Sequence, residues 1–302
     1  MENIEFKTRQ SLNRFKNYKL EKETKIIIKY YKIINGKYNM KKNNIISSET
    51  LFHFTKSADS LISILKNEFH PKYSLEDWTS FVWTPNNKDS KHEVAVPMVC
   101  FCDLPLSKIV DHLVFYGNYG IGLSKDWGVR NGINPVIYLN SKSYLNNYFV
   151  AISKYIMNLG YSDKGLNKIN INLYEFLSFI KMYEGKMWRN YRYVPKRFYD
   201  EREWRFVPKL LRDGEIVNTE GYRLSKSDYL NNITRANANE RIAEKVKLRF
   251  GPEDIKYLIV NSESEIFALI KAISEIKQKY SDDIKKILYS RIISTEQIKS
   301  DF

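Results

Sequence analysis

Two acidic residues and one histidine have the clearest capacity for chemistry in this sequence. Glu201 and Glu203 are two positions apart, so a strand through both would place both carboxylates on one face. Such a carboxylate can stabilise positive charge that develops on a bound substrate, and His53 with Thr55 could hold that substrate. The alternative role is structural, because carboxylates beside arginines also form surface ion pairs and a single strand histidine also serves packing. The residues alone leave both interpretations open.

The cysteines and histidines do not follow a usual metal-binding pattern. Cys100 and Cys102 are separated by one residue, whereas zinc sites usually place two to four residues between paired cysteines. His92 and His112 would be the further ligands of such a site. Alternation along a strand directs both thiols to one face, most simply into the core, and neighbours this close make a poor disulfide. We therefore expect no metal and a reduced, cytosolic protein.

Composition and motifs exclude several classes of function. The chain has 302 residues, of which 43% are hydrophobic, so it can bury a substantial core. No uncharged apolar run approaches the roughly 20 residues of a membrane span, and charges interrupt the first residues where a signal peptide would be apolar. Phosphate-binding and dinucleotide-binding glycine motifs are absent, as are the HExxH and GxSxG motifs of hydrolases. We expect a soluble cytoplasmic protein with no membrane partner.

The chain carries a formal charge of +14, which favours polyanionic partners such as nucleic acid, nucleotides or an acidic protein. Residues 1–50 contain 12 Lys or Arg against 5 Asp or Glu, so we expect residues 1–47 to form a basic, mainly helical arm. Residues 183–199 combine aromatic and basic side chains, which suits stacking on unpaired bases. A loop or helix with half-buried tyrosines is the alternative. The candidate nucleic-acid-binding residues are Trp188, Arg189, Tyr191, Arg192, Tyr193 and Arg197.

Strands and helices mix without regular alternation, which predicts an α+β fold. The expected strands are 51–55, 94–102, 135–139, 203–207 and 255–260. One helix is expected after an N-cap at Ser57, and another over 108–115. Apolar stripes predict two more, over 145–159 and 173–180. A fifth is expected after a capping box formed by Ser262 and Glu265. Polar residues predict a long loop over 71–93, and three glycines predict a tight turn within 116–123.

Several motifs, in order, resemble the AbiGi family of phage abortive-infection proteins, whose members are described as antitoxins. These motifs are LFHFTK at 51–56, PMVCFCDLPLSK at 97–108, His112, YGNYGIGLSKDW at 116–127 and EREWR at 201–205. The resemblance covers an α+β domain over residues 48–275 and implies a cognate toxin or antitoxin as partner. Residues 276–302 are expected to form a helical extension.

A more distant resemblance concerns chemistry. The order of His-x-Thr, a helix, a strand followed by Asp and Ser-Lys, and a late Glu on a strand is similar to ADP-ribosyltransferases. It implies a split mixed or antiparallel sheet, and NAD as a cofactor that is cleaved to modify a nucleic acid or a protein. His53 and Thr55 would then contact the ribose and the amide, Glu203 would be the catalytic carboxylate, and Glu201 could position the acceptor.

The same resemblance needs an aromatic ring to stack on nicotinamide and cations to bind a pyrophosphate. The usual Tyr is replaced by Cys100-Phe101, so Phe101, Tyr116 or Tyr119 would stack instead. The candidate cations include Arg205. Two other functions stay open: a non-enzymatic antitoxin or sensor that binds a toxin or nucleotide, and a basic nucleic-acid-binding protein.

Overall fold

A computed structural model describes residues 48–82, 92–158, 173–189, 192–209, 211–212, 215–216, 223–276, 278 and 280–301. The predicted basic arm, residues 1–47, lies outside these residues.

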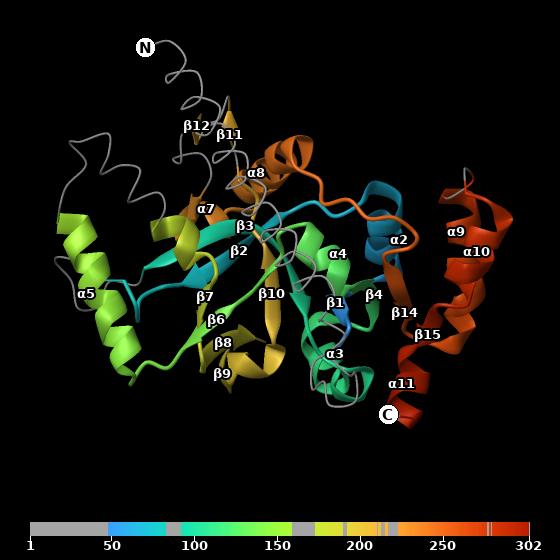
Figure 1. Cartoon of the computed structure of the whole chain (residues 1–302), viewed down its shortest axis with the longest axis horizontal. Coiled ribbons are helices and arrows are strands. Elements are labelled where there is room, and N and C mark those ends of the chain that lie inside the picture. Colours follow the sequence, from blue (N-terminus) through green and yellow to red (C-terminus); the bar gives the residue numbers. More distant parts are fainter. Residues whose placement is uncertain are drawn as a thin grey trace, which may run out of the picture. The chain divides into compact units, whose positions relative to one another are not determined.

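One large sheet organises the described residues (Figure 1). Its strands are β1 (Thr50–Thr55), β2 (Lys72–Asp77), β3 (Glu93–Cys102), β4 (Tyr119–Ser124), β5 (Asn134–Pro135), β10 (Glu203–Phe206), β13 (Leu224–Ser225), β14 (Ile255–Val260) and β15 (Ile292–Ser294). They run in the order β15-β14-β4-β1-β3-β10-β5, and β2 and β13 also pair with β3. The β14–β15 pair is parallel and the other pairs are antiparallel. The predicted α+β class with a mostly antiparallel sheet is confirmed.

Helices and small two-stranded sheets surround this large sheet. The helices are α2 (Ala58–Asn67), α3 (Val110–Tyr116), α4 (Lys125–Arg130), α5 (Tyr144–Asn158), α7 (Lys226–Leu230), α8 (Asn232–Lys245), α9 (Ile266–Ile276), α10 (Asp282–Tyr289) and α11 (Thr295–Asp301). The small sheets pair β6 (Ile137–Leu139) with β7 (Ile180–Met182), β8 (Gly185–Arg189) with β9 (Arg192–Lys196), and β11 (Leu211–Arg212) with β12 (Glu215–Ile216). Within the described part of the chain, none of the helices has the length and apolar character to cross a membrane.

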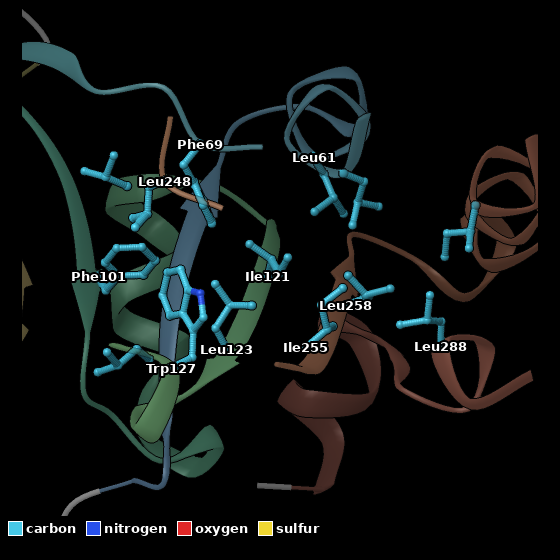
Figure 2. Close-up of a cluster of buried hydrophobic side chains, with 14 of the residues drawn as sticks. Leu61, Phe69, Phe101, Ile121, Leu123, Trp127, Leu248, Ile255, Leu258 and Leu288 are labelled. Carbon is cyan, nitrogen blue, oxygen red and sulfur yellow. The ribbon is translucent and has the colours of Figure 1, made fainter. Parts of the chain in front are cut away.

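The largest hydrophobic core lies against the sheet and beneath α2 (Figure 2). Phe101 and Trp127 meet edge to face with ring centroids 5.5 Å apart. Leu61 and Leu65 of α2 are buried there, as the apolar stripe predicts. The predicted N-cap is confirmed, because the Ser57 hydroxyl accepts a hydrogen bond from an amide of the first turn.

The glycines that predict a tight turn belong instead to a central strand. β4 pairs with β1 along its whole length, from Thr50 to Thr55 of β1. A Cβ atom at Gly120 would lie 2.8 Å from the Phe54 ring, and one at Gly122 would lie 2.8 Å from the Phe52 ring. The glycines therefore leave room for two phenyl rings on the neighbouring strand, which is a packing role that glycine also has within strands.

The strands of the sheet that the sequence patterns did not predict include β2 and β15. β2 lies inside the predicted loop 71–93, and it pairs with β3 from Lys72 to Asp77. β15 lies inside the predicted helical extension 276–302 and pairs with β14. Ile298 of α11 is fully buried, so this C-terminal part packs into the same compact unit as the rest of residues 47–302.

The pairing of β3 is interrupted near its end. Its first part pairs with β2 as far as Met98, while its last residue, Cys102, pairs with Phe52 of β1. Between these pairings, the carbonyl oxygen of Cys100 accepts a hydrogen bond from Nδ1 of His53 at 2.7 Å. The imidazole therefore takes the place of a backbone partner in a gap of the sheet.

Candidate functional site

The strand register decides which predicted site residues lie together. Cys102 pairs with both Phe52 and Glu203, so these three side chains share one face of the sheet. His53 alternates with Phe52 and lies on the other face, where its ring is 5.8 Å from that of Phe101. His53 and Glu203 nevertheless both line one small cavity, so their joint catalytic role stays a prediction.

A buried polar cluster occupies the face that carries Glu203. We define this polar cluster as Glu76, Lys181, Glu201, Glu203 and Arg205. The fully buried Arg205 donates to Glu203 at 2.8 Å and to Glu76 at 2.9 Å, and also to the backbone carbonyl of Ser178. Lys181 bridges the two other carboxylates, at 2.8 Å from Glu201 and 2.9 Å from Glu203. The two predicted acids thus meet at one ammonium group, although Glu201 ends a 3-10 turn rather than lying in the strand.

Both predicted acids stay ionised despite burial. Burial alone would raise the pKa of Glu203, but Arg205 and Lys181 outweigh it and hold the pKa well below its usual range. Burial also favours a higher pKa for Glu201, and Lys181 and Lys196 together lower it. The carboxylates in turn raise the pKa of Lys181 well above its ordinary value, against the effect of burial. The polar cluster therefore consists of paired charges at neutral pH.

Tyr116 connects the polar cluster to the surface. Its hydroxyl donates a hydrogen bond to Glu201, and its ring stacks on His112 with centroids 4.3 Å apart. Lys196 lies 4.9 Å from the same ring and forms an ion pair with Glu201 at 2.6 Å. Burial and the nearby Glu201 charge raise the pKa of Tyr116, so the phenol is a neutral donor.

A cavity of about 170 Å³ lies beside the polar cluster. Lys181, Glu201 and Glu203 line it, together with residues of β1, β2 and β3 that include both cysteines. Small-molecule sites usually enclose about 300–1,000 Å³, so this cavity is too small for a dinucleotide such as NAD.

A larger groove of about 960 Å³ opens on the other side of Tyr116. We call it the Tyr116 groove; Lys56, Asn118, Tyr119 and Lys299 are among the residues that line it. Tyr119 donates to Glu265 at 2.9 Å, and Asn118 donates to Asn261 at 2.9 Å. Within the described ranges, neither Lys56 nor Lys299 forms an ion pair. The Tyr116 groove therefore combines aromatic rings, amides and exposed cations in a volume that would accept a nucleotide.

The predicted cofactor-binding residues separate accordingly. Tyr116 and Tyr119 line the Tyr116 groove. Phe101 is 2% exposed and belongs to the hydrophobic core, although it also lines the small cavity, and its stacking on nicotinamide stays a prediction. Arg205 is wholly buried among its carboxylate partners and cannot reach a pyrophosphate. The Thr55 hydroxyl donates to the backbone carbonyl of Ser57 at 3.1 Å and supports the start of α2.

Sequence reasoning missed two members of the polar cluster, Lys181 and Glu76. Lys181 lies 20 residues from Glu201, and Glu76 lies 129 residues from Arg205. No local spacing connects such residues, because the register of β2, β7 and β10 brings them together. The weak signal in the sequence was Lys181 itself, a lysine between Ile180 and Met182 in an apolar strand.

The aromatic and basic segment forms a hairpin. Trp188 pairs with Tyr193 and Arg189 with Arg192 in the β8–β9 register, while Tyr191 and the side chains of Trp188, Arg189 and Tyr193 lie outside the described residues. Arg192 is exposed, and the exposed Arg197 forms an ion pair with Asp200 at 2.8 Å. Nucleic-acid binding by this hairpin stays a prediction.

The two cysteines are free and lie on the face of the polar cluster. Burial raises the pKa of both thiols, so they are protonated at neutral pH. In the part of the chain that the structure describes, no group of three or more His, Cys, Asp and Glu side chains could hold a metal ion.

His112 is expected to make stability sensitive to mild acid. Burial lowers its pKa from 6.5 to about 4, partly opposed by Glu201. The unfolded chain therefore binds more protons in this range, so the stabilisation is complete above pH 6.5 and is lost as the pH falls towards 4. Between pH 7 and pH 4.5 we expect the free energy of unfolding to fall by about 2 kcal/mol less in His112→Gln than in the unchanged protein.

Urea unfolding at the two pH values measures this difference. Glu201 and Glu203, whose pKa values are lowered, lose their stabilising effect only below their ordinary pKa of 4.5, and do so in both proteins. Equal pH dependence of the two proteins would show that His112 is not the group responsible.

Comparison with known proteins identifies the family. A family model described as "Putative abortive phage resistance protein AbiGi, antitoxin" matches residues 67–261, and the chain belongs to this AbiGi family. The chain is also 33% identical over 265 residues to "Abortive phage resistance protein AbiGi" of Lactococcus lactis subsp. cremoris. That alignment covers 78% of this chain and 99% of the relative. No solved structure matches the chain. The predicted family is confirmed, and the resemblance to ADP-ribosyltransferases stays a prediction.

Proposed function

We propose that this protein acts in abortive phage defence as an antitoxin that binds a partner toxin, and that it does so without cleaving NAD. The description of its family as antitoxins supports the first part. The polar cluster is the single observation that supports the absence of NAD cleavage, because it surrounds Glu203, the carboxylate that would have to act in that reaction.

Cleavage of NAD needs a carboxylate that faces the ribose as positive charge develops there. Both oxygens of Glu203 already accept hydrogen bonds from cations, Oε1 from Arg205 and Oε2 from Lys181 and Arg205. These cations neutralise the charge that would stabilise the sugar. The adjoining cavity, which His53 also lines, holds only about 170 Å³, and Nδ1 of His53 is already hydrogen-bonded to the carbonyl oxygen of Cys100. These observations favour a structural role for the polar cluster, which joins β2, β7 and β10.

Binding of NAD, as distinct from its cleavage, would use the Tyr116 groove. Tyr119 could stack on a base there, and Lys56 and Lys299 could contact phosphates. In this form the protein would be a nucleotide-responsive antitoxin rather than an enzyme.

The proposal predicts a stable complex and no nicotinamide release. The tagged chain, co-expressed with the product of the neighbouring gene, should retain that product through affinity and size-exclusion chromatography. The purified chain, incubated with NAD, should release nicotinamide at the rate of a buffer blank, whether or not titration calorimetry detects NAD binding. Nicotinamide release that is lost in Glu203→Gln but kept in Glu175→Gln, an acid outside the polar cluster, would contradict the proposal. Failure to retain the neighbouring product would contradict the antitoxin role.

A further inference from the structure

Helix α5 buries one side and exposes another that carries large apolar side chains. Asn146 and Ser153 are buried on the inner side, and Phe149 packs against Phe81 and Phe176. Figure 1 shows α5 at the edge of the described fold, on the side opposite α9 and α10. Five large side chains are exposed on its outer side: Tyr144 (79%), Leu145 (56%), Tyr148 (63%), Ile152 (54%) and Tyr155 (68%).

These five residues form one continuous stripe. At 100° per residue they occupy an arc of about 100°, and they extend over about 16 Å of the helix. Phe176, which is 45% exposed and stacks on Phe149, adds a sixth ring beside them. We define the α5 face as Tyr144, Leu145, Tyr148, Ile152, Tyr155 and Phe176.

The α5 face is large for an exposed apolar surface. With full side-chain areas of roughly 200 Å² each, the exposed fractions correspond to about 730 Å², whereas the largest apolar patch of a monomer is typically about 300–600 Å². A standard protein interface buries about 800 Å² on each partner. Tyrosine is also enriched at the centres of interfaces, and three of the six residues are tyrosines.

We propose that the α5 face is the interface of a symmetric homodimer of this protein. Each copy carries a charge of +14, so two copies repel each other over most of their surfaces. None of the six side chains of the α5 face is charged, so two copies can meet there without opposing like charges. An apolar stripe on one helix is also self-complementary about a two-fold axis, which places the two α5 helices side by side. The proposal concerns a surface separate from the Tyr116 groove and does not depend on the proposed antitoxin role.

Light scattering coupled to size-exclusion chromatography tests the proposal on the full chain at 1 to 100 µM, on the order of typical homodimer affinities. We expect a mass of twice 35.9 kDa for the unchanged protein. The double substitution Tyr148→Lys and Ile152→Lys should weaken association at least about 100-fold, because it places four ammonium groups in the apolar interface. Both residues are more than half exposed, so the melting temperature at low protein concentration should change little.

Phe267→Lys provides the matched control, since Phe267 of α9 is 80% exposed and lies outside the α5 face. This variant should remain dimeric. A monomeric unchanged protein across the whole range, or a dimer that the double substitution leaves intact, would overturn the proposal. The chain could instead stay monomeric alone and gain mass only when the partner toxin is added. If the double substitution abolished that gain, the α5 face would be the toxin-binding surface, and the homodimer proposal would be overturned.

Discussion

Replacing Arg205 with alanine is expected to lower the free energy of unfolding by about 3–5 kcal/mol, because removal of one partner leaves buried charges unpaired. Arg205 is fully buried and neutralises Glu203 and Glu76 at 2.8 and 2.9 Å. Its guanidinium also satisfies the carbonyl of Ser178. Arg205→Lys should recover only part of the loss, because one ammonium group cannot reproduce the planar fork that contacts three groups.

Arg130→Ala is the matched control for this prediction. Arg130 forms an equally short ion pair with Asp254, at 2.7 Å, but its side chain is 63% exposed. Its loss should cost less than about 1 kcal/mol, because water screens the pair and can replace it. Urea or thermal unfolding measures both variants. Similar losses for Arg130 and Arg205 would contradict the view that burial of the polar cluster makes it important for stability.

Gly117→Ala is the substitution with the second large expected effect. Gly117 has a φ of +113°, a region that is essentially restricted to glycine. A Cβ atom at this position would lie 2.1 Å from the backbone oxygen of Thr55, so the chain between α3 and β4 would have to move. Strain and steric overlap together should cost roughly 3 kcal/mol or more. Because Gly117 lines the Tyr116 groove, the groove would change shape as well.

Gly132→Ala separates the cost of the backbone conformation from the cost of the steric overlap. Gly132 also has a positive φ, +69°, but a Cβ atom there would have no neighbour within 4 Å. Its alanine variant should lose only about 1 kcal/mol, the cost of the backbone conformation alone. The difference between the two variants in denaturant unfolding isolates the overlap with Thr55. If both variants lost the same free energy of unfolding, the overlap with Thr55 would contribute nothing, which would contradict the prediction.

Local patterns predicted the elements that depend on local interactions. The N-cap at Ser57 and the apolar stripe of α2 need only neighbouring residues, and both are confirmed. The predicted capping box at Ser262 is not formed: the Ser262 side chain makes no cap, and Glu265 accepts from the amide of Asn261 rather than from that of Ser262. β2 could not be predicted in the same way, since it is a largely polar strand that is defined by its pairing with β3.

The candidate site shows more clearly that local patterns do not predict long-range strand pairing. Alternation correctly separated His53 from Phe52, whereas the expected strand through Glu201 and Glu203 begins only at Glu203 and Lys181 brings the two acids together. Which face of the sheet each occupies depends on the register at Cys102, and a single sequence contains no measure of that register. The joint catalytic site therefore stays a prediction: the register places the His53 and Glu203 side chains on different faces, while both residues line one small cavity.

The parallel strand β15 has a consequence for how the protein is made. It covers the outer edge of β14, yet it emerges from the ribosome after every other strand of the sheet. Until then the backbone groups of β14 face solvent and offer a template for intermolecular pairing. Polypeptides released shortly before residue 292 should therefore aggregate during synthesis, whereas in the folded protein the three residues of β15 and helix α11 close this edge.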